Sequence, residues 1–402
     1  MKKGIYELKG KLQHYAWGGK NFLPELLHLT KEDKPYAEYW MGAHDNFPSD
    51  VVMENGQLKP LNHLIEEEPE LLLGDDVEER FGKLPFLFKV LDVKDMLSIQ
   101  VHPTKEEAEI GYEKEDDLGI PLKAPHRNYR DDNHKPEVLI ALSEFWLLHG
   151  FRSENEIKEI FKKYSSFSSL EKEFESGSYK KLYNTVMTMP QQQVDELLTP
   201  LLAPVLDDYR NNKLSKNDPA FWAARAVETY CGGKLSSFDR GIFSIFFFNL
   251  VELKKGESVF QSAGIPHAYL EGQCMELMSN SDNVLRGGLT AKHIDVPELM
   301  KHTKFEAVDP VIMKGEEHDH ERVFNCPVPD FMISSAILKP GDVLSGHASS
   351  IEIIFCAAGE AKEPDLNVNI TGGKAYIVTA ATDYDIEAIA ETVLYKASVP
   401  SE

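Results

Sequence analysis

The sequence predicts a mainly β protein that carries one α-helical insertion. Short β-rich runs separated by Gly, Pro, Asn and Asp dominate the first 150 residues and return after residue 236. The stretch 152–235 between them has apolar residues at helical spacing instead. Short strands with frequent turn residues are typical of a sandwich or a barrel. Similar turns from residue 331 to the end hint at a second barrel of related design.

The N-terminal part is expected to contain strands at 84–93, 96–101 and 138–148, because these runs are short and rich in β-branched and aromatic residues. Between them, the highly charged segment 105–117 predicts a helix. The polar segment 121–133 is interrupted by prolines and predicts a loop.

Ser153 marks the start of the helical region. Glu156 follows it at the spacing of a capping box, and Ile157 and Ile160 begin an apolar helical pattern. The glycines that follow Cys231 form a strong stop signal. We therefore expect residues 152–235 to be helical, inserted between two β regions.

Strand character is expected to return at 242–253, an apolar run that is too short and too interrupted to span a bilayer. We interpret it as buried strands. The sequence Lys-Lys-Gly-Glu at 254–257 predicts a hairpin turn that leads into a strand at 258–261.

Composition narrows the classes of partner. The chain has 402 residues, of which 42% are hydrophobic, enough for two or three domains with a sizeable core. Its net charge of −23 argues against nucleic acid or a membrane surface as the main partner, but allows a small anionic substrate where basic residues cluster. Four widely spaced cysteines and the lack of an N-terminal apolar run predict a cytoplasmic protein.

A first group of candidate metal ligands lies on one strand. Alternation places Ser98, Gln100 and His102 on one face and the two apolar residues between them on the other. An edge strand with one solvated side would show the same pattern. The motif therefore needs support from other segments.

Two further segments give that support. Glu137 stands at the entrance of an apolar strand, where a lone carboxylate is costly to bury and needs a metal ion or a lysine as its partner. His267 follows a turn at the start of another strand, where a histidine more often has a structural role. With Gln100 and His102 they form a mixed nitrogen and oxygen set that suits Zn²⁺. Because no cysteine belongs to it, the set favours a catalytic zinc.

Several motifs resemble those of the type I mannose-6-phosphate isomerase family. The four longest are SIQVHP at 98–103, NHKPE at 133–137, PHAYLEG at 266–272 and SDNVLRGGLTAK at 281–292. Residues 15–18 and 38–44 resemble the N-terminal motifs of the same family. The resemblance runs in the same order from about residue 5 to residue 300, and beyond about residue 305 only β character remains.

The resemblance implies a cupin fold, with two cupin-like β-barrels (double-stranded β-helix, jelly-roll) and a helical domain. Residues 1–151 and 236–320 would form the catalytic barrel with its metal site, 152–235 the helical insertion domain, and 321–402 a C-terminal cupin-like β domain. It implies one Zn²⁺ per chain. The implied ligands are Gln100, His102, Glu137 and His267.

The implied reaction interconverts D-mannose 6-phosphate and D-fructose 6-phosphate by proton transfer through a cis-enediol. The family's catalytic arginine falls on Arg286. Lys135 would orient the substrate or act as the base, Glu276 would carry a proton, and His134 would assist opening of the sugar ring. Each of these four residues also has an ordinary alternative role. Arg286 would be a surface arginine paired with an acid, and Lys135 a lysine that neutralises nearby acid. Glu276 would be a solvent-facing carboxylate, and His134 a loop histidine.

Ser98 and Lys292 are the candidates for phosphate binding. Asp282 is a further candidate for substrate binding, and its alternative role is that of a surface partner of Arg286. Two positions near Arg286 depart from the family pattern. Ala291 stands where a proline is usual and Gly287 where an alanine is common, and both changes could loosen this loop.

Two other functions remain open at this point. A metal-dependent cupin oxygenase would use an iron bound by two histidines and one carboxylate. A non-enzymatic sugar-binding cupin would keep the barrel but would have no use for basic residues beside the metal. For the isomerase, the expected partner is a small phosphorylated sugar, with no nucleic acid or membrane partner, and the protein is expected to be a monomer or a weak homo-oligomer.

Overall fold

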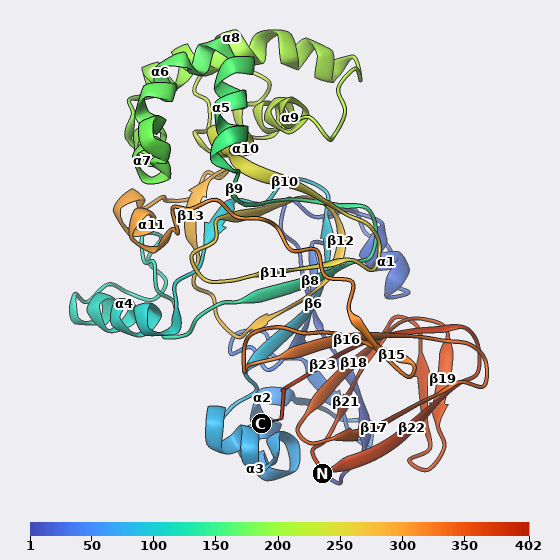
Figure 1. Ribbon diagram of the computed structural model, residues 1–402. Helices are drawn as coiled ribbons and strands as arrows, with labels where there is room; N and C mark the ends of the chain where they lie inside the picture. Colours follow the sequence, from blue (N-terminus) through green and yellow to red (C-terminus); the bar gives the residue numbers. More distant parts are fainter. Residues whose placement is uncertain (402) are drawn as a thin grey trace.

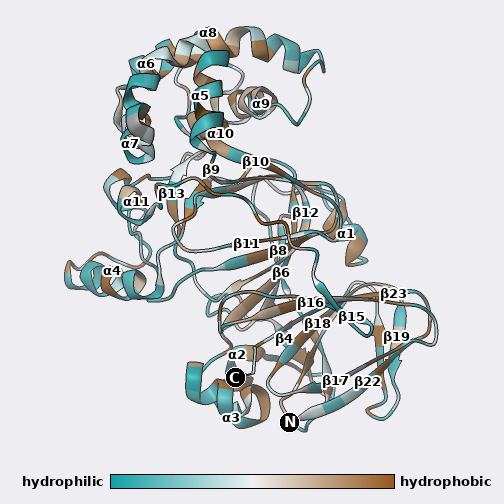
Figure 2. Ribbon diagram, viewed as in Figure 1, coloured by the Kyte–Doolittle hydropathy of each residue, from teal (hydrophilic) through white to brown (hydrophobic). Residues whose placement is uncertain are grey.

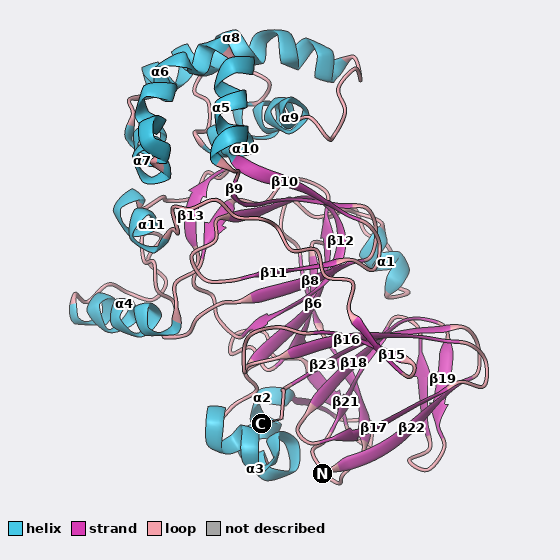
Figure 3. Ribbon diagram, viewed as in Figure 1, coloured by secondary structure: helices cyan, strands magenta, loops and turns pink. Residues whose placement is uncertain are grey.

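The structure is a computed structural model that describes residues 1–401. It confirms a mainly β protein with helices (Figure 3). Figure 1 shows the green helices at one end, a β region in the middle, and the orange and red C-terminal strands at the other end, close to the N-terminus. Within the described residues, no helix is long and apolar enough to cross a membrane.

The middle β region is a ten-stranded antiparallel sheet. Its long strand β12 pairs with β7 and β9 along its first part and with β6 and β8 along its second part, so it connects most of the sheet. The strands are β2 (Lys11–Gln13), β3 (Glu38–Gly42), β6 (Phe86–Val93), β7 (Ile99–Val101), β8 (Glu137–Ala141), β9 (Phe145–Phe151), β10 (Phe248–Leu253), β11 (Ser258–Gln261), β12 (His267–Ser279) and β13 (Leu285–Gly288).

The C-terminal β region contains a nine-stranded sheet and a four-stranded sheet. The larger sheet has the order β14-β15-β16-β23-β18-β21-β1-β4-β5, so the first strand of the chain lies among the last ones. Its strands are β1 (Ile5–Lys9), β4 (Asp50–Val52), β5 (Leu58–Pro60), β14 (Glu316–His318), β15 (Glu321–Phe324), β16 (Met332–Leu338), β18 (Glu352–Ala358), β21 (Lys374–Val378) and β23 (Thr392–Ser398). The smaller sheet contains β17 (Val343–Ala348), β19 (Glu360–Glu363), β20 (Val368–Thr371) and β22 (Thr382–Ala388).

The helical block confirms the helical prediction for 152–235. The Ser153 side chain accepts from the Glu156 amide and the Glu156 side chain bonds back to Ser153, which completes the capping box. The helices of the block alternate between hydrophilic and hydrophobic segments (Figure 2), as expected for helices that pack on one side. They are α5 (Glu154–Lys163), α6 (Ser168–Glu171), α7 (Tyr179–Thr188), α8 (Gln191–Arg210), α9 (Pro219–Cys231) and α10 (Gly241–Phe247), with 3₁₀ turns at 165–167 and 172–177.

Five more helices lie outside this block in the described residues. They are α1 (Phe22–Leu26), α2 (Leu61–Glu67), α3 (Pro69–Phe81), α4 (Lys105–Asp117) and α11 (Val296–His302). The helix at 105–117 and the loop at 121–133 agree with the sequence predictions.

The interpretation of 242–253 as strands is wrong for its first half. Residues 241–247 form α10, and every side chain of this helix is buried. An apolar run that is buried on all sides has no periodicity to distinguish helix from strand, so packing decides. The region 138–148 is likewise two strands, β8 and β9, with a break at 142–144.

The hairpin expected at 254–257 is also a wrong prediction, although the turn itself forms, with the Glu257 amide 2.9 Å from the Lys254 carbonyl oxygen. The flanking strands do not pair with each other. β10 pairs with β9 and β11 pairs with β8, because each strand finds its partner elsewhere in the sheet.

Candidate active site

Four polar side chains stand in one row across neighbouring strands. Arg286 on β13 lies opposite Gln100 on β7, which lies opposite His267 on β12, which in turn lies opposite His149 on β9. Residues opposite each other in antiparallel strands project to the same face of the sheet. The register therefore brings together residues that are far apart in the sequence.

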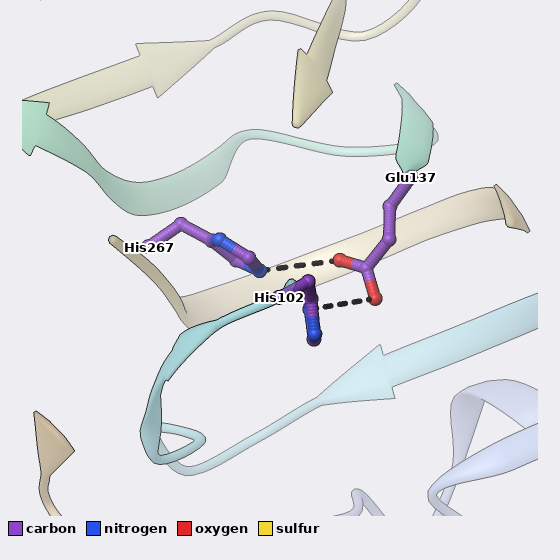
Figure 4. Close-up of side chains that lie close together, drawn as sticks. All are labelled: His102, Glu137 and His267. Atoms are coloured by element: carbon purple, nitrogen blue, oxygen red, sulfur yellow. Dashed lines mark ion pairs between the residues drawn. The ribbon is translucent and has the colours of Figure 1, made fainter. Parts of the chain in front are cut away.

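A buried cluster of two histidines and one carboxylate lies at this row. His102 Nε2 is 3.4 Å from one carboxylate oxygen of Glu137, and His267 Nε2 is 3.2 Å from the other (Figure 4). Each of these side chains is no more than 5% exposed. Of the described residues, these are the only three His, Cys, Asp or Glu side chains close enough together to hold a metal ion.

The outer nitrogens of both histidines fix their tautomers. His102 Nδ1 lies 2.8 Å from the carbonyl oxygen of Asn283, and His267 Nδ1 lies 2.9 Å from that of Ile265. A neutral ring has one N–H, which Nδ1 donates to the carbonyl, so Nε2 carries a lone pair. These two Nε2 atoms have no hydrogen-bond partner among the described residues.

This arrangement fits a cation. The Nε2 lone pairs face the oxygens of Glu137, and lone pairs that face each other repel unless a positive ion lies between them. Burial lowers the pKa of His102 to about 4, so its ring is neutral at pH 7, as a metal ligand must be. Burial acts to raise the pKa of Glu137, but the charge of Lys135 holds it well below its ordinary value.

Glu137 therefore has both kinds of partner that the sequence suggested, a site for a metal ion and a lysine. Lys135 Nζ lies 3.3 Å from its carboxylate, on the same side as His102. Gln100 faces the same site from β7 and is the fourth predicted ligand.

A cavity of about 650 Å³ opens beside Gln100, which is large enough for a small metabolite. It collects most of the predicted site residues. Those that line it are Ser98, Gln100, Lys135, Asp282, Arg286 and Lys292.

Positive charge gathers at one side of this cavity. Neither Arg286 nor Lys292 has an ion pair within residues 1–401. Burial lowers the pKa of Lys292, and the neighbouring charges of Arg286 and Arg130 lower it further. Cations that crowd together without a carboxylate between them make a site for an anion.

Asp282 lines the cavity but is not the partner of Arg286. Its carboxylate lies 3.3 Å from His44 Nε2, and its amide donates to Asp131 at 2.7 Å. Burial acts to raise the pKa of Asp282, but the hydrogen bond and charge of His44 hold it below the ordinary value. Asp282 therefore remains ionised at the edge of the cavity.

Five of the predicted residues lie outside the cavity lining: the three members of the buried cluster, His102, Glu137 and His267, and also Glu276 and His134. Glu276 is buried behind Lys89, whose Nζ lies 3.1 Å from its carboxylate, and burial raises the pKa of Glu276. His134 Nε2 lies 2.9 Å from Asp330 in the C-terminal part of the chain.

Sequence reasoning missed several residues of the cavity wall. Lys89 lines the cavity and also lies 3.6 Å from Glu38, and its signal was available, because a lysine inside the apolar run 84–93 needs a buried acidic partner. Thr229 and Tyr230 reach the cavity from the end of α9. No local pattern distinguishes these two from other residues of that helix.

Gly287 packs tightly in this structure. A Cβ at this position would lie 2.6 Å from the hydroxyl of Tyr183 and 3.0 Å from Cγ2 of Ile99. The strand beside Arg286 therefore approaches the helical block closely, and the lack of a side chain at residue 287 permits close packing here instead of a loose loop.

Comparison with known proteins agrees with this geometry. Residues 5–154 match the family model of the phosphomannose isomerase type I catalytic domain. The mannose-6-phosphate isomerase of Salmonella typhimurium is 37% identical over 368 residues, which cover 89% of this chain and 90% of that protein. The human mannose-6-phosphate isomerase is 34% identical over 369 residues, which cover 84% and 83% of the two chains.

Solved structures agree as well. A crystal structure of the Salmonella typhimurium mannose 6-phosphate isomerase bound to fructose 6-phosphate and zinc superposes with a TM-score of 0.88 at 34% identity, covering 99% of this chain and 100% of that chain. A zinc-bound mannose 6-phosphate isomerase superposes equally well, with a TM-score of 0.88. The chain therefore belongs to the type I mannose-6-phosphate isomerase family.

Proposed function

We propose that this protein interconverts mannose 6-phosphate and fructose 6-phosphate with one zinc ion per chain. The observation that carries the proposal is a metal-ligand cluster next to a cation-lined cavity, joined by Lys135, which lines the cavity and lies 3.3 Å from Glu137. The cluster of His102, Glu137 and His267 fits a divalent cation, and the unpaired Arg286 and Lys292 fit a phosphorylated sugar. The relatives bear the name of this activity, and one of them has been solved with zinc and fructose 6-phosphate.

Four side chains would hold the zinc ion: Gln100, His102, Glu137 and His267. Two imidazoles, a carboxylate and an amide leave room for an oxygen of the sugar, as catalytic zinc sites do. When bound, zinc supplies Lewis-acid polarisation of the carbonyl and hydroxyl oxygens of the sugar.

The cations of the cavity have two roles in this proposal. Lys292 and Ser98 bind the phosphate, and Arg286 stabilises the negative charge that develops on the enediolate oxygens. Arg286 suits this role because it lies beside Gln100 in the strand register and has no competing carboxylate. Asp282, at the cavity edge, accepts hydrogen bonds from the sugar hydroxyls.

The proton between C1 and C2 is moved by Lys135 or Glu276. Lys135 lines the cavity and lies against Glu137, so it reaches the substrate directly. Glu276 is a buried carboxyl with a raised pKa, which lets it hold a proton closer to neutral pH, and Lys89 connects it to the cavity. The role of His134 in ring opening stays a prediction, because its ring here contacts Asp330.

We also propose the domain organisation that the family implies. Residues 1–151 with 236–320 form a catalytic cupin barrel, 152–235 a helical domain, and 321–402 a cupin-like β domain of double-stranded β-helix type. The middle sheet and the helices between 154 and 231 support this division, while β1, β4, β5 and β14 pair within the C-terminal sheet and α10 extends the helical block to residue 247. The four free cysteines support a place in the reducing cytoplasm, and the protein is proposed to be a monomer or a weak homo-oligomer.

Turnover and metal content together test the activity. Protein purified without chelator should contain about one zinc per chain, isomerise mannose 6-phosphate, lose this activity with a chelator, and regain it with zinc. Fully active protein with almost no metal would overturn the zinc proposal. Oxygen uptake with bound iron would favour the oxygenase, and sugar binding without turnover would favour the non-enzymatic sugar-binding cupin.

A further inference from the structure

One carboxylate outside the cavity binds the backbone of the segment that carries two cations of the cavity wall, Arg286 and Lys292. Asp239 lies between α9 and α10 in the helical part of the chain. Its Oδ1 accepts the amide N–H of Gly241 and of Leu289, both at 2.7 Å, and its Oδ2 accepts that of Thr290 at 3.1 Å. Among the described residues no cation pairs with Asp239, so its charge is directed at these three amides.

The backbone that Asp239 holds is unusual. Leu289 has φ 52°, a left-handed conformation that is unfavourable for a residue with a side chain. Such a conformation persists only where the surroundings fix it. A Cβ on Gly241 would lie 2.6 Å from the amide nitrogen of Leu289, so the two backbones touch at this point.

The held segment continues directly into the cavity. Arg286 precedes it on β13, its own residues Leu289 and Thr290 line the cavity, and so does Lys292, which follows. The Lys292 amide donates to Thr290 Oγ1 at 3.1 Å, which extends the connection to the lysine itself.

We infer that Asp239 is a positioning residue for phosphate binding: from the helical block it fixes the backbone that follows β13, at residues 289–290, so that Lys292 reaches the phosphate of the substrate. This inference rests on the proposed function. The helical block thereby takes part in substrate binding without supplying a ligand to the metal.

The chain offers a matched control in Asp195 on α8. Its carboxylate accepts the amides of Ser237 at 2.9 Å and Phe238 at 3.0 Å, which is the same kind of bond in the same block. No bond of Asp195 reaches the 285–292 loop in the structure as described. Asp195→Ala therefore removes hydrogen bonds of the same kind next to Asp239, while the three bonds that Asp239 itself accepts stay in place.

Inorganic phosphate, used as a competitive inhibitor and as a calorimetric ligand of the zinc enzyme, is the probe. Asp239→Ala should weaken phosphate affinity and raise KM for mannose 6-phosphate in parallel, each on the order of tenfold, since charge-assisted hydrogen bonds are lost. Asp239→Asn keeps an oxygen acceptor and should weaken both about threefold. Zinc content should stay at the wild-type level in both variants.

Asp195→Ala should lower the melting temperature while its phosphate affinity stays within about twofold of wild type. A folded Asp239→Ala variant with unchanged phosphate affinity would overturn the inference, and so would an equal loss in Asp195→Ala. If Asp239→Ala does not fold, Asp239→Asn decides in the same way. A wild-type protein that binds phosphate but shows no isomerase turnover would instead remove the proposed function.

Discussion

Arg286 illustrates how a single residue acquires a function from its place in the register. It stands opposite the predicted metal ligand Gln100 on the neighbouring strand, in the wall of the cavity. Burial and the nearby charge of Arg130 lower its pKa, yet a guanidinium remains charged at any working pH. A half-buried cation without an acid partner is available to stabilise developing negative charge.

Replacing Arg286 separates three roles. If it stabilises the enediolate, Arg286→Ala should lower kcat about 10²–10³-fold, or roughly 3–4 kcal/mol, and Arg286→Lys should recover only part because lysine lacks the planar fork. Steady-state kinetics with zinc measured in parallel checks this, and the zinc content should not change. A higher KM at constant kcat would indicate a grip on the phosphate alone, and an alanine variant with wild-type constants would remove the catalytic role.

Gly287 next to it allows a second test at the same scale. Gly287→Ala should destabilise the protein by about 1–3 kcal/mol, because the added methyl group overlaps the hydroxyl of Tyr183. Tyr183→Phe removes that hydroxyl, so the double variant should regain much of the lost stability. Urea denaturation of the four proteins measures the coupling. Equal losses in the single and double variants would show that the contact with Ile99 dominates instead.

At the scale of the elements, α11 and the 121–133 loop are joined by a polar cluster. His302 Nε2 lies 3.0 Å from Glu298 and 2.7 Å from the Tyr129 hydroxyl. The hydrogen bond of His302 is the largest effect that lowers the pKa of Glu298 below its ordinary value of 4.5. Since Tyr129 precedes Arg130 and the Lys135 segment, this cluster supports the loop that reaches the active site.

The cluster predicts a pH dependence of stability. Because the folded pKa of Glu298 is below the unfolded one, its contribution is complete above about pH 4.5 and is lost as the pH falls toward the folded value. Glu298→Gln should therefore be less stable than wild type at pH 7 by about 1–2 kcal/mol, and this difference should shrink below pH 4.5. Urea denaturation at pH 7 and pH 4 measures both values. A difference that does not change with pH would contradict a charge-dependent role.

Across the whole molecule, the two ends of the chain are joined in one sheet. β1 pairs along its length with β21, with Ile5 opposite Val378 and Leu8 opposite Ala375. The Gly4 amide also donates to Thr379 Oγ1 at 2.9 Å. The C-terminal β region therefore depends on the first ten residues for an interior strand.

Removing residues 1–9 tests this dependence. The variant loses the buried side chains of Ile5, Tyr6 and Leu8, each worth about 1.5–3 kcal/mol, and should be destabilised by roughly 5 kcal/mol or more. Thermal unfolding followed by circular dichroism measures the loss. Removal of residues 1–3 alone should change little, since β1 remains. A full-length melting temperature after removal of residues 1–9 would show that β21 does not need β1.

The sequence alone determined what depends on neighbours along the chain. The capping box at Ser153 and the loop at 121–133 are local patterns, and the structure contains both. Of the alternating residues, Ser98 and Gln100 line the cavity, although β7 itself covers only residues 99–101. The ligand candidates could be chosen because their chemistry, a mixed nitrogen and oxygen set around a buried carboxylate, does not depend on the exact fold.

Tertiary structure decided everything that depends on contacts between distant segments. Whether 241–247 is helix or strand, which strand partners β10 and β11 take, and that β1 joins the C-terminal sheet follow from packing that no local period records. The pairing of Glu276 with Lys89 and the hold of Asp239 on Leu289 arise in the same way. Burial and register bring such groups together only after the chain has folded, because the free energy of these contacts depends on sheet partners that local sequence does not specify.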